Sequence, residues 1–226
     1  MKKEMNKIKT QIDFGVTRGH LSSSLIYTTL NHYNRGGSTK MTASQLIGVA
    51  FEFYDATESP DITLFIDART RARAFIERYE VNSRSEIKKA AENVTPHLEI
   101  ELLQPSTKFF CFDGDNKSIQ IMWQLLEGMR YRDRASFLNK VLFQYFAHGN
   151  CNFYNELCSE RLLVWLKEEL LISKEIGMER FNRVADMILD YAGSAEPIIE
   201  NDDLFIESSS TSDRLRKAMG LTEIAN

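Results

Sequence analysis

Apolar residues recur at helical spacing through most of this chain, and no other feature constrains its fold as strongly. The repeat places one apolar residue every three or four positions, which is typical of helices that bury one face. We expect such a stripe to be core, although its excess in 157–189 could also form a dimer interface. The segments that show the repeat are 17–33, 46–54, 134–147, 151–176 and, after an interruption at Gly177, 179–191.

Four shorter segments are predicted to be β-strands, and alternation of side chains supports two of them, 62–66 and 118–124. They are 62–66, 97–103, 108–112 and 118–124. Asp113-Gly114-Asp115-Asn116 is a strong turn signal between the last two. The predicted fold class is therefore α+β, mainly helical, with short antiparallel strands and a C-terminal helical region.

Helix starts are marked by residues that can accept hydrogen bonds from free backbone amides. Thr42 or Ser44 can cap the second helix. Ser83 and Glu86 have the spacing of a capping box, so a helix is predicted to begin there. Ser59-Pro60 is interpreted as the break that ends the second helix.

Composition excludes several classes of protein. The 226 residues contain no run of about 18 apolar residues, so no membrane span is predicted. Three cysteines are too few for a disulfide scaffold, which favours a cytoplasmic location. The net charge of −4 is carried by residues 194–226, whereas basic residues concentrate in 69–89 and 130–140.

Residues 62–92 combine a short strand, an amphipathic helix, a turn and a helix that starts Arg-Ser-Glu-Ile. This arrangement resembles the ribbon-helix-helix family of DNA-binding proteins. The resemblance implies that two strands pair as an antiparallel ribbon, enter the major groove and read base edges. Residues 117–146 echo the unit with a shorter first helix. Phe65 departs from the family, because polar side chains usually face outward at that position.

The resemblance assigns roles to nine residues. Thr63, Ser118 and Gln120 are expected to contact DNA bases. The expected phosphate contacts are Ser83, Arg84, Ser85, Lys88, Arg130 and Arg134. The predicted domains are an N-terminal helical region (1–59), a strand-and-helix domain of DNA-binding type (60–149), C-terminal helices (150–193) and an acidic, flexible tail (194–226).

No set of residues suggests catalysis or metal binding. His97 with Cys111 is the one nucleophile–base pair to check, and no hydrolase motif surrounds it. His148, Cys151 and Cys158 are interpreted as a histidine near buried thiols. We therefore predict no enzyme activity, no cofactor and no metal.

Two functions of different classes follow. The first is a sequence-specific DNA-binding regulator of transcription, or a plasmid-partition adaptor, that binds double-stranded DNA as a dimer or other homo-oligomer. Its acidic tail would recruit a protein partner or restrain non-specific binding. The alternative is a phage- or plasmid-type accessory protein that acts by protein–protein interaction without DNA. Its arginines would then pair with Glu77, Glu80 and Glu86 on helix faces.

Overall fold

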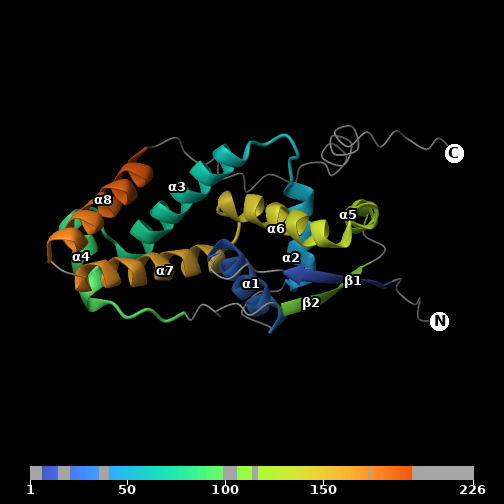
Figure 1. Ribbon diagram of the computed structural model, residues 1–226, viewed down its shortest axis with the longest axis horizontal. Helices are drawn as coiled ribbons and strands as arrows, with labels where there is room; N and C mark the ends of the chain where they lie inside the picture. The colour runs from blue at the N-terminus through green and yellow to red at the C-terminus, as the bar shows by residue number, and fades with distance from the viewer. Residues whose placement is uncertain are drawn as a thin grey trace. The chain divides into compact units, whose positions relative to one another are not determined.

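The computed structural model describes residues 7–14, 21–35, 41–98, 106–113, 117–172 and 174–194. These residues form eight helices and two strands, which divide into two compact units (Figure 1). Unit 1 contains the described parts of 1–59 and 101–145, and unit 2 those of 60–100 and 146–200. No described helix is both long enough and apolar enough to cross a membrane.

Unit 1 joins four helices to a two-stranded ladder. Strands β1 and β2 pair antiparallel, with Lys7 opposite Asp113 and Phe14 opposite Ser106. Both β2 and α5 contact α2, which also touches α1. The elements are β1 (Lys7–Phe14), α1 (Leu21–Asn34), α2 (Ala43–Phe53), β2 (Ser106–Asp113), α5 (Lys117–Gly128) and most of α6 (Tyr131–Ala147).

Helix α2 begins where the sequence predicts a cap. The Gln45 backbone N–H donates to Thr42 Oγ1 at 3.3 Å, and the Thr42 N–H donates to Gln45 Oε1 at 2.8 Å. This reciprocal pair is a capping box, which satisfies two backbone donors that the helix leaves free. Thr42 is therefore the cap of the second helix, as one of the two predicted alternatives.

Gln144 of α6 fastens the turn that follows α2. Its side chain accepts from the Asp55 N–H at 3.1 Å and donates to the Asp55 carbonyl at 3.0 Å and to the Glu58 carboxylate. A buried amide is costly without such partners. The pairing therefore fixes the path of the chain just before unit 2 begins.

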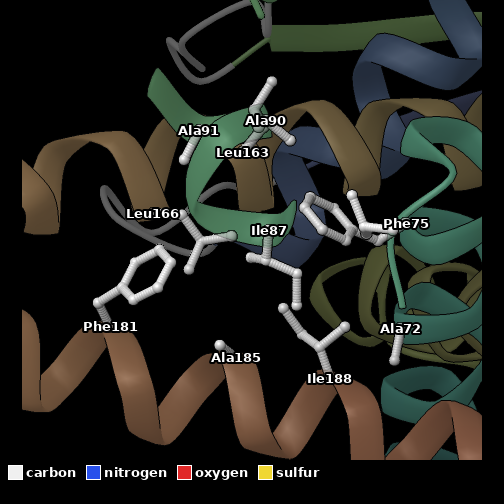
Figure 2. Close-up of a cluster of buried hydrophobic side chains, with 11 residues drawn as sticks. Ala72, Phe75, Ile87, Ala90, Ala91, Leu163, Leu166, Phe181, Ala185 and Ile188 are labelled. Carbon is white, nitrogen blue, oxygen red and sulfur yellow. The ribbon is translucent and has the colours of Figure 1, made fainter. Parts of the chain in front are cut away.

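Unit 2 consists of four helices that converge on one apolar cluster (Figure 2). Helices α3 (Pro60–Tyr79) and α4 (Arg84–Asn93) come from one part of the chain, and α7 (Asn152–Leu171) and α8 (Lys174–Gly193) from another. Both α7 and α8 pack against α3 and α4. The buried members of the cluster are Ala72, Phe75, Val81, Ile87, Ala90, Ala91, Leu163, Leu166, Phe181, Ala185 and Ile188.

Two residues with positive φ lie just after the ends of helices α3 and α6. At the end of α3, Glu80 has φ 51°, and the Val81 N–H donates to the Ile76 carbonyl at 3.3 Å. That bond and that backbone conformation are those of a Schellman motif. After α6, Gly149 has φ 79°, a conformation in which glycine carries no steric cost.

The predicted α+β fold class with ribbon-helix-helix-like units is wrong. Eight helices carry most of the described residues, and both segments that were expected to form the ribbon lie in helices. The described strands β1 and β2 pair with each other instead. Residues 62–66 are in α3, and residues 118–124 are in α5. Pro60 is the first residue of α3, where a missing N–H costs nothing, so it starts a helix as well as ending the preceding segment. In α5 the buried Ile119, Met122 and Leu126 follow helical spacing, which overrides the local alternation.

Other predicted elements are placed differently or lie outside the described residues. The predicted strand 108–112 falls within β2. Of the predicted strand 97–103, only 97 and 98 are described, and they are irregular. The long C-terminal helix is interrupted after Leu171 and not at Gly177, which lies inside α8. The turn residues 114–116 and the tail from 195 onward lie outside the described residues.

Candidate interaction surface

In the first half of α3, polar side chains face the interior and apolar side chains face outward, the reverse of an ordinary surface helix. Thr63, Asp67 and Thr70 follow helical spacing and are buried, with exposed fractions of 1–6%. On the other side, Ile62, Leu64 and Phe65 are 50–55% exposed. Isolated exposed apolar residues are ordinary on protein surfaces, whereas a buried carboxylate opposite clustered apolar side chains is not. This half of α3 therefore presents its apolar face to its surroundings.

Helix α8 extends this apolar face. The rings of Phe65 and Tyr191 meet edge to face, with centroids 5.8 Å apart. Met187 lies one turn before Tyr191 on the same side of α8 and is 45% exposed. Figure 1 shows the start of α3 and the end of α8 at the same end of unit 2. We call Ile62, Leu64, Phe65, Met187 and Tyr191 the α3–α8 surface.

Two exposed carboxylates flank the α3–α8 surface. Asp61 lies one turn before Phe65, and Asp190 lies three residues after Met187. The next residue of α3 on this side, Arg69, is half-buried. The exposed ends of this surface, at the start of α3 and the end of α8, are therefore acidic, whereas Arg183, one turn before Met187, pairs with Glu179 at 3.2 Å.

Beneath this surface, Asp67 pairs with Arg71 one turn later on α3. Burial raises the pKa of the Asp67 carboxyl to about 6, although the Arg71 guanidinium opposes the shift. Desolvation of a carboxylate favours its neutral form, which explains the direction. The inner face of α3 thus carries a charge that costs stability at neutral pH.

Tyr154 and Cys158 of α7 face this ion pair. Burial raises the pKa of the Cys158 thiol to about 12 and that of the Tyr154 phenol well above its ordinary value. A thiol must ionise to act as a nucleophile. Cys158 is therefore an inert structural residue, as is expected of a buried cysteine.

Thr70 contributes a further polar contact on the inner face. Its hydroxyl donates to the Ala147 carbonyl at 3.0 Å, which satisfies an acceptor at the end of α6. This bond gives one buried polar residue of α3 a structural reason to face inward. On the opposite face, Phe65 contacts Tyr191 and yet remains 50% exposed.

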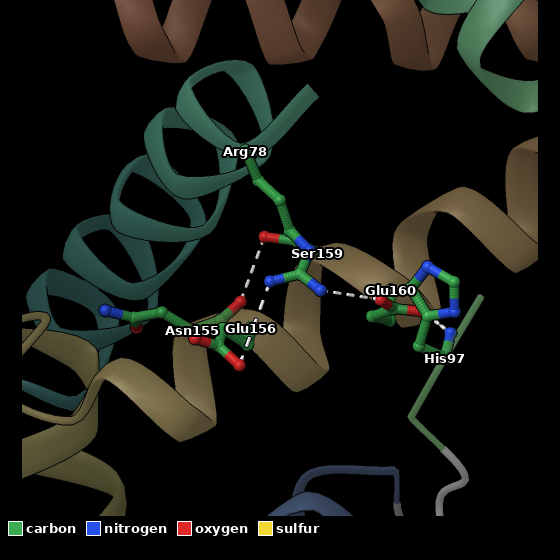
Figure 3. Close-up of polar contacts among 6 residues, drawn as sticks. All are labelled: Arg78, His97, Asn155, Glu156, Ser159 and Glu160. Carbon is green, nitrogen blue, oxygen red and sulfur yellow. Dashed lines mark hydrogen bonds and ion pairs between the residues drawn. The ribbon is translucent and has the colours of Figure 1, made fainter. Parts of the chain in front are cut away.

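Glu160 of α7 is buried and binds both the later part of α3 and the chain after α4 (Figure 3); we call this arrangement the Glu160 clamp. Its Oε1 accepts from Arg78 Nη2 at 2.8 Å, and its Oε2 accepts from the His97 backbone N–H at 2.7 Å. Arg78 Nη1 also lies 3.8 Å from Glu156. The clamp uses the backbone of His97 and ties the chain after α4 to α3 and α7, so its role is structural.

His97 and Cys111, the nucleophile–base pair that the sequence suggested checking, fall in different units. His97 belongs to unit 2 and Cys111 to β2 of unit 1, where its side chain is not described. Among the described residues, no group of three or more histidines, cysteines or acids could hold a metal ion. Cys151 and Cys158 are buried free thiols.

The predicted DNA contacts fall into two groups in different units. In unit 2, Thr63 faces the interior. The Ser83 hydroxyl lies 3.2 Å from that of Ser85 and makes no cap bond, so the predicted capping box is not formed. Glu86 accepts instead from the Asn82 N–H at 2.8 Å.

The basic residues of this group have acidic partners. Arg84 binds Asp186 of α8 through two bonds, of which the Nη2–Oδ2 bond is 2.6 Å. Lys88 lies 3.9 Å from Glu92. A guanidinium in a bidentate pair is already neutralised, which reduces its attraction to phosphate. Arg71, Arg78 and Arg84 pair with Asp67, Glu160 and Asp186, in that order.

The second group lies in unit 1. Gln120 is exposed on α5, and Ser118 is the second residue of that helix, with a side chain that is not described. Arg130 is exposed between α5 and α6, and Arg134 Nε donates to the Met129 carbonyl at 3.4 Å. Neither group lies on a strand. The antiparallel ribbon on which the predicted base contacts depended is therefore not formed by these residues.

The α3–α8 surface was missed because 62–66 was interpreted as a strand. A signal was present, since Pro60 can open a helix and Thr63, Asp67 and Thr70 then form a polar stripe. The chain matches no protein-family model, no curated protein and no solved structure.

Proposed function

We propose that this protein is an interaction module that binds another protein through the α3–α8 surface. The observation that supports the proposal is the reversed polarity of α3, where Phe65 is 50% exposed and Asp67 is buried. Burying apolar area on a partner is the main favourable term in association, and aromatic residues dominate such interfaces. Phe65 and Tyr191 supply two aromatic rings in contact.

The chemistry of the surface indicates the kind of partner. Two packed helices present an apolar strip that suits an amphipathic helix laid against it. The acidic rim at Asp61 and Asp190 favours a partner with basic residues beside its apolar face. The proposed class is an accessory protein that acts by protein–protein contact.

This function is preferred to DNA binding for physical reasons. A ribbon needs two strands, and the segments expected to form it are helical. Arg84 and Lys88, which were expected to contact phosphate, face carboxylates. Phosphate contacts supply most non-specific DNA affinity, so occupied cations weaken that hypothesis.

A photo-crosslinking residue in place of Phe65 tests the proposal. We expect it to capture one partner reproducibly, while the same residue at Leu171, which is 83% exposed on α7, does not capture it. With that partner purified, Phe65→Asp should weaken binding by about 30-fold, the effect of losing an aromatic anchor. Leu171→Asp should leave the affinity unchanged.

Two results would overturn the proposal. The first is equal capture from positions 65 and 171. The second is binding to a mixed-sequence DNA duplex that falls steeply between low and physiological salt and is indifferent to Phe65→Asp. That second result would return the DNA-binding hypothesis to first place.

A further inference from the structure

We propose that residues 60–71, the first half of α3, open from the rest of unit 2 as one segment, and that ionisation of Asp67 promotes the opening. The structure shows the closed form of this segment. Two observations support the proposal: the kind of residue that the segment buries, and the environment that it gives the Asp67 carboxyl. The effect of the opening on a partner rests on the proposed function, whereas the opening itself does not.

The first half of α3 buries polar residues, and the second half buries apolar ones. Between 61 and 71, the buried residues are Thr63, Asp67 and Thr70. The helix enters the buried apolar cluster of unit 2 at Ala72 and continues in it with Phe75 (Figure 2). Burial of apolar area is the dominant favourable term in folding. The first half therefore has less to hold it than the second, which is typical of segments that open locally.

The contacts of Asp67 and Thr70 hold the segment weakly. Asp67 pairs with Arg71, which belongs to the same helix, so this ion pair does not fasten α3 to a neighbour. Thr70 does reach a neighbour, since its hydroxyl donates to the Ala147 carbonyl at 3.0 Å. On opening, that hydrogen bond is exchanged for hydrogen bonds with water, so its net contribution is small.

Opening returns the Asp67 carboxyl to water. In the closed form, Arg71 is the charged group that acts on it, and Tyr154 and Cys158 of α7 face the pair as neutral groups. Burial outweighs the attraction of the guanidinium and raises the pKa of the carboxyl to about 6. As the pH rises through this value, the ionised form accumulates and favours the open segment.

Hydrogen exchange of the full-length protein tests the opening. After correction for intrinsic rates, we expect the amides of 64–71 to be less protected than those of 72–79 at every pH. From pH 5 to pH 7 the protection of 64–71 should fall about tenfold, because the pKa of the Asp67 carboxyl changes from about 6 to 3.8 on opening. Equal protection of the two halves overturns the separate opening. Protection that does not change with pH overturns the role of Asp67.

Two matched variants assign the pH dependence to one carboxyl. Asp67→Asn should remove it, because an amide does not ionise. Asp61→Asn removes an exposed carboxyl from the first turn of the same helix and should keep the tenfold change. A pH dependence that survives in Asp67→Asn, or that disappears in Asp61→Asn, refutes the assignment.

The Cys158 thiol gives a second readout in the unmodified protein. It lies on α7 beside the Asp67–Arg71 pair and is 4% exposed, so an alkylating reagent reaches it once the segment has opened. A local opening exposes little surface, and its free energy therefore depends weakly on urea. We expect the labelling rate of Cys158, located by peptide mapping, to be nearly constant at low urea. A rate that rises as steeply as global unfolding contradicts the proposal.

A bound partner should hold the segment closed, and this step rests on the proposed function. Phe65 lies on the segment and Tyr191 lies on α8, so a partner that covers both rings joins the two. We expect the partner captured at position 65 to raise the protection of 64–71 several-fold. Unchanged protection in the complex refutes this coupling.

The opening and the proposed function fail in different ways. A partner captured at position 65, together with equal protection of both halves of α3, refutes the opening and leaves the interaction module standing. The expected pH profile with no partner captured supports the opening and refutes the proposed function.

Discussion

Asp67 is a buried carboxylate that destabilises the folded state when it is ionised. It is 1% exposed on the inner face of α3, where apolar residues usually lie. Its pairing with Arg71 offsets only part of the cost of removing a carboxylate from water. A buried carboxylate here is explained if the exposed apolar face on the other side of α3 serves binding, at a cost to the stability of the fold.

The pH dependence of unfolding follows from the raised pKa of Asp67. Its value rises from 3.8 to about 6 on folding, so protonation favours the folded state. The stabilisation is complete below pH 3.8 and is lost as the pH rises through about 6. We expect this residue to contribute about 3 kcal/mol across the window, since each pKa unit corresponds to about 1.4 kcal/mol.

Urea unfolding of Asp67→Asn between pH 4 and 7 measures this contribution. The free energy of unfolding of the unmodified protein, relative to the variant, should fall as the pH rises. Arg71 stays charged throughout this pH range. Removal of its partner therefore changes the free energy of unfolding of the variant by the same amount at every pH, and the slope of the difference against pH reports Asp67 alone. Parallel curves for the two proteins would contradict the prediction.

At the scale of elements, the sequence predicts a helix correctly where residues that mark its ends are present. Helix α4 begins at Arg84, as Asn82-Ser83 predicts, and α6 ends before Gly149, as predicted for His148-Gly149-Asn150. The start of helix α3 was not predicted, because the five residues 62–66 fit the strand pattern as well as the helix pattern. Short segments cannot separate the two periods, and the deciding residue was Pro60.

The candidate surface depends on that same decision. Read as a strand, 62–66 places Thr63 and Phe65 on one side. Read as a helix from Pro60, the segment separates them and joins Thr63 to Asp67 and Thr70. The contact with Tyr191 could not be predicted, because periodicity shows which face of a helix is apolar and not which helix covers it.

The α7–α8 hairpin depends on a close backbone approach. A Cβ at Gly177 would lie 2.2 Å from the Glu169 carbonyl oxygen and 2.9 Å from that of Ile172. Both neighbours are backbone atoms, so neither can move aside by rotating a side chain. We expect Gly177→Ala to destabilise the protein by about 3 kcal/mol in thermal or urea unfolding.

Gly193→Ala is the matched control for this prediction. Gly193 ends the same helix, and nothing lies within 4 Å of an added Cβ. Alanine has the higher helix propensity, so the control should lose no stability. Equal effects of the two substitutions would show that helix propensity, and not the close approach, governs this hairpin.

At the scale of the whole molecule, unit 2 is assembled from two separated segments. Helices α3 and α4 precede residue 98, whereas α7 and α8 follow residue 151. The apolar faces of the first pair are covered by Leu163, Leu166, Phe181 and Ile188 of the second. Most of the stability of helices in proteins comes from such packing of an apolar face.

A chain that ends at residue 150 should therefore lose the structure of α3 and α4. We expect the amides of 60–98 to exchange at close to unstructured rates in this shortened chain. A chain that ends at Ser194 keeps all four helices and should retain their protection. Unchanged protection in the shorter chain would contradict the role assigned to α7 and α8.

The divided origin of unit 2 has a consequence during synthesis. When α4 leaves the ribosome, Phe75 and Ile87 lack the cover that α7 and α8 supply, because α8 is complete only at Gly193. At typical elongation rates the wait lasts roughly 5–20 s, far longer than helix formation or collapse takes. The nascent chain thus exposes the apolar faces of α3 and α4 throughout that delay, which is when it is most prone to aggregate.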